Sequence, residues 1–552
     1  MKKTIFSIGC VIFFLAVFAS CEKLDVKAPD RFTEESVWKD HATVQAYINS
    51  KYRDLVWGFY YDGVWQQPLW SAFSDECFDQ YGFSVKLMSN QISSSTGDPY
   101  IPGYGTNWAK NYKYIRDCNL FFGKINTVPN LSTVTKAKMV GEMHFIRAFR
   151  YFDLLRNYGG VPIITKVYAI GDDFKVTRNT VEETFSYIIS EIDSAVTNLP
   201  SSYSDDQYGR ATIDVALALK SRVLLYQASE YWNTNGDQSK WTLAANAAKV
   251  IIDEGTYTLD PDYKGLFLTD KNSEVIFSRL AKAQSGITGN YFYPELYCGP
   301  NGYMGQGGNN PTQNLVDDYE MANGKMISES GSGYDPQNPY IGRDPRFYAS
   351  ILYNGAEYHG RQVEVFMPGG VDTPDGPNPS GASVTGYSLR KFMKENIEIK
   401  NDPNAGSQPF VIFRLAEIYL NYAEALNESQ GPVADVYTYL NLIRQRAVIP
   451  DMPAGLSKEQ MRDRIRHERR IELAFEEHRY YDVRRWKIAD QIESNDIMGV
   501  YVTKDDAGLH YDFSRVTLQR VWDARQYLFP IPKGELQINP DLVQNPGYLA
   551  ND

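Results

Sequence analysis

Histidine and cysteine, the usual side-chain ligands of transition metals, are scarce in this chain. Its 552 residues include six His and five Cys, and no two Cys have the CxxC spacing of zinc and redox sites. His467-Glu468 has the first two residues of the HExxH zinc-protease motif, but Ile471 stands where the second His belongs. The GxSxG, Walker and dinucleotide-binding GxGxxG motifs are also missing. These gaps exclude the common metal-, serine- and nucleotide-dependent enzymes, so we predict that the protein is not an enzyme.

Carboxylates are the one catalytic residue type in good supply, with 68 Asp and Glu. A glycosidase needs two carboxylates that flank the bond to be cleaved. Asp75 and Glu76 are neighbours in the sequence, so their side chains point in different directions and do not make a favourable pair. The EF-hand spacing is absent, but a structural Ca²⁺ held by loop carbonyls and carboxylates remains an alternative. We expect no other cofactor and no other bound metal.

Positive charge is also in deficit, because the formal net charge is -12 at pH 7. A nucleic-acid partner is therefore excluded, since a protein that binds phosphates needs a surplus of Lys and Arg. The densest charged run, residues 462–487, interleaves its arginines with Glu468, Glu472, Glu476 and Glu477. Alternating signs predict salt-bridged helices that join layers of a scaffold.

The N-terminus has the three parts of a bacterial lipoprotein signal. Lys2 and Lys3 give a positive start, and residues 5–19 form an apolar stretch too short for a typical membrane-spanning helix. Small residues then precede Cys21, as in a lipobox, although Phe18 departs from the usual aliphatic residue. We predict a signal peptide over residues 1–20, acylation of Cys21 and a polar tether over 21–30. An ordinary cleaved signal or a short anchor is the alternative.

Apart from Cys10 in the leader and the acylated Cys21, three cysteines remain: Cys77, Cys118 and Cys298. Their odd number and wide spacing give no disulfide framework. The sequence predicts three buried thiols, with a single disulfide bond as the alternative.

Most of the mature chain has helical periodicity. From Glu142 onward, Phe145, Phe149, Phe152 and Leu155 recur on one helical face, and the helix is expected to end at Gly159-Gly160, before Pro162. Two helix pairs follow, over residues 210–232 with 241–253 and over 413–427 with 433–446. Their alanines and aromatic residues are typical of antiparallel pairs that stack as a solenoid.

Two long stretches, residues 58–106 and 285–410, are instead rich in Gly, Pro, Asn, Ser and Tyr. Loops of this length usually carry function. The glycines between Gly299 and Gly308 predict a flexible loop. Residues 527–548 are interrupted by prolines and predict an irregular strap.

Several segments, in this order, resemble the SusD/RagB family across almost the whole mature chain. They include Tyr158-Gly159-Gly160-Val161-Pro162, Arg343-Asp344-Pro345-Arg346-Phe347 and Asn545-Pro546-Gly547-Tyr548, with further matches at 74–76, 108–119, 147–154, 311–321, 386–392, 414–425, 470–482 and 528–532.

This resemblance implies a mostly α fold, in which about four tetratricopeptide-like helix pairs carry long irregular insertions that form the ligand face. It further implies one domain over residues 31–552, with an aromatic loop at 58–106, a ligand region at 285–410 and a helical part at 411–552. A SusC-like TonB-dependent transporter is the implied partner, and the cell exterior side of the outer membrane is the implied location. The matched motifs are structural and do not identify the ligand.

Sugars have an apolar C–H face and a polar rim, so their sites combine aromatic rings with amides. Both loops offer this mixture of residues. We predict that glycan-binding side chains come from Trp65, Trp70, Gln80, Tyr81, Tyr100, Tyr104, Asn290, Tyr291, Tyr293, Tyr297, Asn301 and Tyr303.

The sequence therefore predicts a surface lipoprotein that captures oligosaccharides for import. A peptide-binding protein of the RagB type is the main alternative, and its groove would expose fewer stacking rings. A surface glycosidase lacks a catalytic constellation, and a pure helical scaffold would leave the aromatic loops without a purpose.

Overall fold

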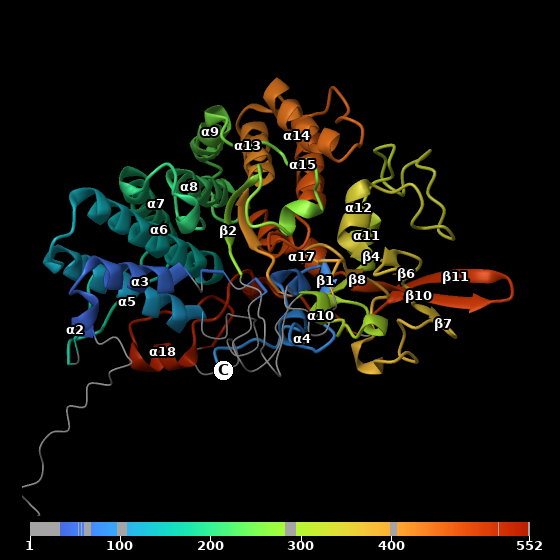
Figure 1. The fold of residues 1–552 in the computed structure, drawn as a ribbon, viewed down its shortest axis with the longest axis horizontal. Helices are drawn as coiled ribbons and strands as arrows, with labels where there is room; N and C mark the ends of the chain where they lie inside the picture. The colour runs from blue at the N-terminus through green and yellow to red at the C-terminus, as the bar shows by residue number, and fades with distance from the viewer. Residues whose placement is uncertain are drawn as a thin grey trace, which may run out of the picture.

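The computed structural model describes residues 34–52, 55–56, 58–59, 68–95, 107–169, 171–281, 294–397, 406–516 and 518–549. The predicted signal peptide, Cys21 and the tether lie outside these residues. Within them, the fold is mostly helical, as predicted (Figure 1).

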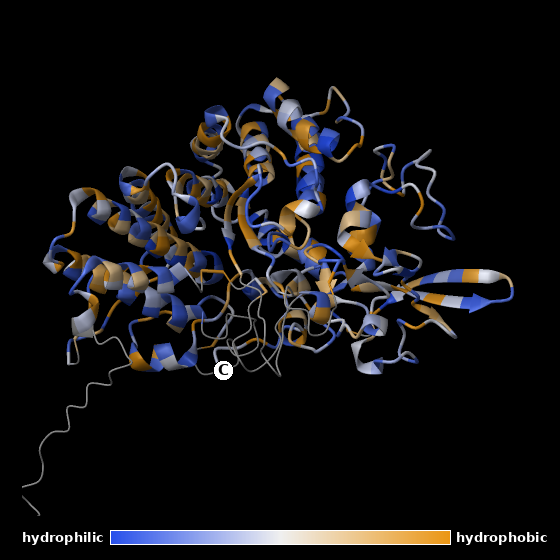
Figure 2. Ribbon diagram, viewed as in Figure 1, coloured by the Kyte–Doolittle hydropathy of each residue, from blue (hydrophilic) through white to orange (hydrophobic). Residues whose placement is uncertain are grey.

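The scaffold is a curved row of helices in which successive members pack against each other. Its first part contains α2 (Glu34–Val37), α3 (His41–Tyr52), α5 (Asn107–Lys124), α6 (Thr133–Tyr158), α7 (Val181–Asn198), α8 (Ile213–Ala228) and α9 (Gln238–Glu254). Its second part contains α13 (Leu415–Gln430), α14 (Ala434–Arg446) and α15 (Lys458–Glu472). Helix α9 packs directly on α13, so the row continues across the long segment that separates them in sequence. Figure 2 shows hydrophobic residues along the helix faces that meet.

Local sequence signals account for the ends of these helices. The Ser132 side chain accepts a hydrogen bond from the Thr135 backbone at the start of α6, and Gly159, with φ of 79°, follows its end as predicted. A Cβ at Gly160 would overlap the Asn179 carbonyl oxygen, so only glycine fits there. Helix α7 begins with a capping box between Thr180 and Glu183.

The segment between α9 and α13 leaves the scaffold and returns to it through two paired strands, and we call this segment the insertion. Strand β2 (Val275–Arg279) enters the segment and pairs antiparallel with β9 (Phe410–Arg414), which leads into α13. Over residues 294–397, the helices and strands of the segment are short: α10 (Pro294–Cys298), β3 (Asn310–Pro311), α11 (Gln313–Asp318), α12 (Pro345–Ser350), β4 (Ile351–Leu352), β5 (Glu357–Tyr358), β6 (Arg361–Gln362), β7 (Phe366–Met367) and β8 (Ser388–Leu389).

The N-terminal loop joins this insertion through a two-residue strand. Strand β1 (Cys77–Phe78) pairs antiparallel with β3, and helix α4 (Val85–Met88) follows it. The two regions predicted to form a ligand face are therefore in direct contact, although more than 200 residues separate them in sequence.

The C-terminal part adds a hairpin that the sequence did not predict. Strands β10 (Met498–Asp505) and β11 (Gly508–Arg515) pair antiparallel, and β10 also pairs in parallel with β7. The hairpin projects from the body, at the right of Figure 1. Helices α16 (Arg479–Arg485) and α17 (Ala489–Glu493) precede it, and the irregular strap after it contains one short helix, α18 (Lys533–Ile538).

The charged run at 462–487 forms buried ion pairs, which confirms its predicted scaffold role. Glu472 on α15 accepts hydrogen bonds from Arg414 at 2.7 Å and Arg346 at 3.0 Å, and Glu468 pairs with Arg444 at 2.9 Å. All of these side chains are buried, so the network joins the scaffold to the insertion as well as helix to helix.

Cys77, Cys118 and Cys298 are buried free thiols, as predicted. In the part of the chain that the structure describes, His, Cys, Asp and Glu form no cluster of three that could hold a metal ion. Among the helices of that same part, none combines the length and the apolar character needed to cross a membrane.

Candidate functional site

The candidate site lies where the N-terminal loop meets two turns of the insertion. The Gln80 side-chain amide donates hydrogen bonds to the backbone carbonyls of Gln306, at 2.5 Å, and Ser380, at 3.0 Å. The Tyr81 hydroxyl donates to the same Gln306 carbonyl at 2.8 Å. Three segments that are distant in sequence therefore share one surface, which we call the loop face and define by residues 79–83, 297–308 and 378–382.

A buried carboxyl group holds the first of these segments in place. Asp79 accepts hydrogen bonds from the backbone N–H groups of Tyr81, at 3.1 Å, and Phe83, at 2.5 Å. Its side chain is fully buried, and this burial raises its pKa to about 7 against the effect of those bonds. Asp79 thus fixes the turn that presents Tyr81, from beneath the surface.

Tyr81 is the exposed ring of the loop face. Its side chain is 43% exposed, and its ring stacks on that of Tyr297 with centroids 6.2 Å apart and planes 16° apart. Tyr297 itself is only 7% exposed. Tyr297 was predicted to contact a ligand, but its ring is covered by Tyr81 and by the backbone at Gly308, so in this structure it supports Tyr81 from behind.

The glycines beside Tyr297 pack tightly, which corrects the prediction of a flexible loop. A Cβ at Gly308 would overlap the Tyr297 ring, and a Cβ at Gly305 would overlap the Gly299 carbonyl. Asn301 is also buried, and its amide donates to the carbonyls of Thr373, at 2.8 Å, and Asn378, at 3.1 Å. Asn301 was predicted to bind the ligand, but its amide instead links two turns of the insertion.

Tyr303 is half-buried and held on two sides. Its hydroxyl donates to the Tyr358 carbonyl at 2.5 Å, and the Arg361 guanidinium lies over its ring, 3.8 Å from the centroid. Arg361 in turn pairs with Asp372 at 2.7 Å. Because this cation occupies one face of the Tyr303 ring, a sugar could not stack on that face. Tyr303 stays a predicted ligand residue.

Trp70 is a core residue, contrary to its prediction as a ligand residue. Its side chain is 1% exposed and packs against Tyr480 with centroids 4.6 Å apart, with Phe73, Tyr481 and Phe529 around it. Trp108, which the family motifs assigned to the scaffold, is buried as expected. Asp75, also assigned to the scaffold, accepts hydrogen bonds from Arg470 and Arg479.

The remaining predicted residues fall outside the described part of the chain. They stay predictions: Trp65, Tyr100, Tyr104, Asn290, Tyr291 and Tyr293.

Sequence reasoning missed three residues of the loop face. Met304 has a left-handed backbone, with φ of 68°, and an exposed side chain. Asn378 donates to the Gly305 carbonyl at 2.9 Å, and Ser380 accepts from Gln80. The Asn378-Pro379-Ser380 turn was the available signal for the last two residues, because Asn-Pro marks a turn.

Two family models match this chain. The model described as SusD family matches residues 273–548, and the model described as starch-binding associating with outer membrane matches residues 24–225. SusD-like protein P2 of Formosa agariphila is 25% identical over 558 residues, which cover 97% of this chain and 98% of that protein. A SusD-like protein of Bacteroides ovatus is also 25% identical, with 86% and 82% covered.

Solved structures give the same result. A SusD-like protein from Bacteroides fragilis has a TM-score of 0.79 and 30% identity, with 94% of this chain and 99% of that chain covered. A SusD-like carbohydrate binding protein from the same organism has a TM-score of 0.77 and 26% identity, with 92% and 100% covered. The family models and these relatives show that the chain belongs to the SusD family.

Proposed function

We propose that this protein captures oligosaccharides at the cell surface without cleaving them and delivers them to a SusC-like TonB-dependent transporter. The observation that carries the proposal is the setting of Tyr81. Its exposed ring is backed by Tyr297, and its edge is surrounded by the Gln80 amide and the turn at Gln306. A supported ring of this kind offers a flat apolar surface to the C–H face of a sugar, and the polar groups at its rim suit hydroxyls.

Two comparisons support a carbohydrate ligand. One structural relative, at 26% identity over 92% of the chain, is described as a carbohydrate binding protein. The family model that matches residues 24–225 is described as starch-binding. The same description names association with the outer membrane. The lipobox-like residues that end at Cys21 supply the means of attachment, and the transporter partner is inferred from the family.

The proposal predicts that Tyr81→Ala weakens glycan binding. The loss of one stacked ring costs about 0.5–1.5 kcal/mol beyond buried area, which is about two- to tenfold in Kd. The experiment screens the mature body against neutral and anionic polysaccharides by affinity electrophoresis, and product analysis of each mixture detects cleavage. Tyr501→Ala is the matched control, because Tyr501 is 51% exposed and lies on β10, outside the residues of the loop face.

Each outcome of this screen has a defined meaning. Binding without cleavage, weakened by Tyr81→Ala and not by Tyr501→Ala, supports glycan capture at the loop face. Retention of peptides but of no glycan would favour the peptide-binding alternative. Release of shorter sugars would show that the protein is an enzyme and would overturn the proposal.

A further inference from the structure

A second cavity lies on the helical scaffold, away from the loop face. It has a volume of about 580 Å³ and lies between α3, the first half of α6 and the segment 203–210 that leads into α8. In Figure 1 these helices lie at the left, whereas β1 and α10, which carry the loop face, lie right of centre. Sites for small molecules commonly have volumes of about 300–1,000 Å³, so the cavity is large enough for a short chain of sugars.

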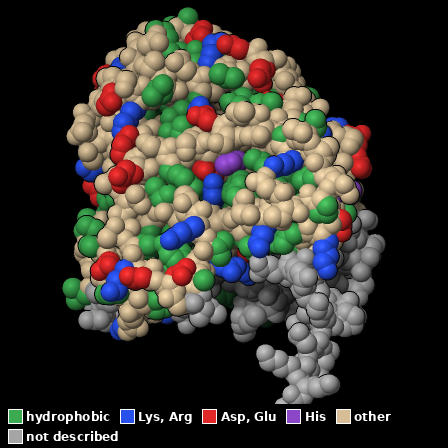
Figure 3. Space-filling view, turned by 90° about the vertical axis from the view of Figure 1, so that its left-hand side faces the viewer, with side chains coloured by type: hydrophobic (Ala, Val, Ile, Leu, Met, Phe, Trp, Pro, Cys, Tyr) green, Lys and Arg blue, Asp and Glu red, His purple; other side chains and the backbone are tan. Residues whose placement is uncertain are grey.

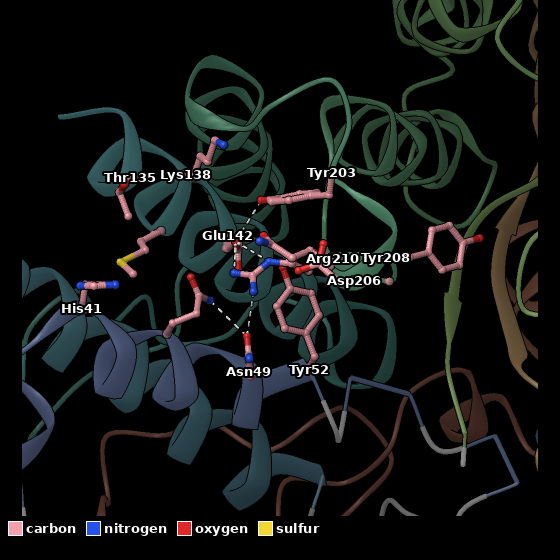
Figure 4. Close-up of a pocket in the computed structure, with 14 residues that line it drawn as sticks. His41, Asn49, Tyr52, Thr135, Lys138, Glu142, Tyr203, Asp206, Tyr208 and Arg210 are labelled. Carbon is pink, nitrogen blue, oxygen red and sulfur yellow. Dashed lines mark hydrogen bonds and ion pairs between the residues drawn. The ribbon is translucent and has the colours of Figure 1, made fainter. Parts of the chain in front are cut away.

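A hydrogen-bonded chain of side chains builds the floor of this cavity (Figure 4). Glu142 is fully buried and accepts hydrogen bonds from Arg210, at 2.5 and 2.8 Å, and from the Tyr203 hydroxyl, at 3.0 Å. Arg210 also donates to the Asn49 side-chain oxygen at 3.1 Å, and Gln45 donates to that same oxygen at 3.1 Å. Each member is thus held by the next, so the floor is already arranged before any ligand arrives.

The same chain has hydrogen-bonding capacity that its own bonds do not use. The two bonds to Asn49 use its oxygen, so its side-chain nitrogen keeps two hydrogens to donate. Gln45 donates to Asn49 and keeps its own oxygen as an acceptor, and the Lys138 ammonium adds donors at the rim. Donors and acceptors that alternate over a few ångströms suit hydroxyl groups, because each hydroxyl can both donate and accept.

The charges that line the cavity balance. Lys138 and Arg210 are opposed by Glu142 and Asp206, and the first of these carboxylates already pairs with Arg210. Figure 3, which views the molecule from the left of Figure 1, shows acidic and basic side chains interspersed with neutral ones and no field of one sign. A site without surplus charge favours a neutral ligand over a uronate or a sulfated sugar.

Three tyrosines line the cavity: Tyr52, Tyr203 and Tyr208. Tyr203 is half-buried, and Figure 4 shows its hydroxyl directed at Glu142, whereas the Tyr208 ring points away from the ion pair. The hydroxyl bond to Glu142 fixes the Tyr203 ring at the edge of the cavity. A fixed ring beside alternating polar groups is the combination that sugar sites use.

We propose that this scaffold cavity is a second binding site for a neutral oligosaccharide, distinct from the loop face. The inference rests on the proposed function, since it assigns a second site to the same class of ligand. Two sites on one chain would hold a long glycan more tightly than either alone, because the second contact forms at a high effective concentration. The scaffold would then retain a polymer while the loop face engages another part of it.

The test compares cavity variants with loop-face variants in the full mature chain, purified in a detergent without a sugar headgroup. Gln45→Ala with Asn49→Ala removes the polar floor from the surface of α3, and Thr135→Trp fills the cavity from α6. Isothermal titration with short neutral oligosaccharides from the screened polysaccharides measures affinity and stoichiometry. We expect about two sites in the wild type, and either cavity variant should weaken one of them roughly fivefold or more.

Matched variants separate the two sites and the two proposals. Ser50→Ala, on α3 but outside the cavity, should leave both sites unchanged, and Tyr81→Ala should weaken only the other site. Unchanged stoichiometry and affinity in both cavity variants would overturn the second site and leave glycan capture standing. No glycan binding by the wild type would overturn both. If an oligogalacturonate bound the cavity more tightly than a neutral oligosaccharide of the same length, the proposal of a neutral ligand would be overturned.

Discussion

At the scale of single residues, the loop face depends on which of two tyrosines is exposed. Tyr81 and Tyr297 are both aromatic loop residues in the sequence, yet one is 43% and the other 7% exposed. The difference arises from Gly308, whose missing side chain lets the backbone lie against the Tyr297 ring. Composition could therefore predict a face rich in tyrosine, but it could not assign these roles, because they depend on contacts between distant segments.

Gly308→Ala should disturb this arrangement. The added methyl group would overlap the Tyr297 ring, and Tyr297 supports Tyr81. Overpacking of this kind costs about 1–3 kcal/mol, so we expect a lower melting temperature and weaker glycan binding together. Gly123→Ala on α5 is the control, because a Cβ there meets open space and alanine favours a helix by up to about 1 kcal/mol. Equal melting temperatures for wild type and Gly308→Ala would contradict the role of this close contact.

Glu76 gives a prediction for the dependence of stability on pH. Its side chain is 1% exposed, and burial raises its pKa from 4.5 to about 8, although it accepts a hydrogen bond from the Phe475 backbone. A carboxyl whose pKa rises on folding favours the folded state below pH 4.5, and this contribution is lost as the pH rises toward 8.

Glu76→Gln should remove that dependence, because the amide stays neutral and keeps an oxygen for the Phe475 N–H. The variant should match the wild type near pH 4 and become more stable with increasing pH, by on the order of a few kcal/mol at pH 8. Thermal unfolding at pH 4, 6 and 8 measures the difference. Glu357→Gln, at an exposed position on β5, should show no such increase with pH. A constant difference between Glu76→Gln and wild type would argue against a neutral Glu76.

At the scale of elements, the sequence predicted features that depend on neighbouring residues, and it missed strand pairings between residues far apart in the chain. Helix α6 ends at Gly159-Gly160 as expected, because the stop signal lies within the helix and its next turn. The antiparallel pair β2–β9 joins residues about 135 apart, and no local pattern marks that pairing. Helix α7 was missed although its capping box, Thr180 to Glu183, was present in the sequence as a start signal. The β10–β11 hairpin was missed as well, despite the two-residue Asp506-Ala507 turn between its strands and the glycine that follows it.

The ion pairs of Arg414 connect three of these elements. Arg414, at the end of β9, donates to Glu472 of α15 at 2.7 Å, to Glu476 at 2.7 Å and to Glu274, just before β2, at 2.6 Å. Arg414→Met should leave these buried carboxylates without their shared cation, which costs about 3–5 kcal/mol. Thermal or urea unfolding should show a clearly lower midpoint. Lys271→Ala, which removes an exposed pair with Asp205, should leave the midpoint unchanged. A small effect of Arg414→Met would mean that Arg446, Arg346 and Lys391, which also pair with these carboxylates, are enough to stabilise them.

At the scale of the whole molecule, the insertion is fastened to the scaffold by backbone pairing and by buried ion pairs. Strands β2 and β9 close its base, and the buried charges of α15 bind Arg346 inside it. The loop face is therefore carried on a rigid support, although it contains little regular structure of its own. This support explains why the family motifs fall on buried scaffold residues such as Trp108 and Asp75, and why they could predict the fold without naming a ligand.

Attachment to the membrane is the last prediction at this scale, and it depends on one residue outside the described part of the chain. The small residues that precede Cys21 resemble a lipobox, so we expect attachment to rest on acylation of this cysteine. Several acyl chains anchor a protein stably, whereas one chain binds only marginally. Wild-type protein should incorporate labelled palmitate and sediment with outer membranes, and Cys21→Ser should do neither.

Cys10→Ser is the control for this experiment, since Cys10 lies within the predicted signal peptide and should leave labelling intact. Labelled palmitate in Cys21→Ser would refute the lipobox. If the label is lost but the protein still sediments, either a bound partner or an uncleaved leader, acting as a short anchor, holds it. A wash that dissociates protein complexes would release protein that a partner holds. Protein that stays with the membrane after this wash and retains residues 1–20 would be held by its leader.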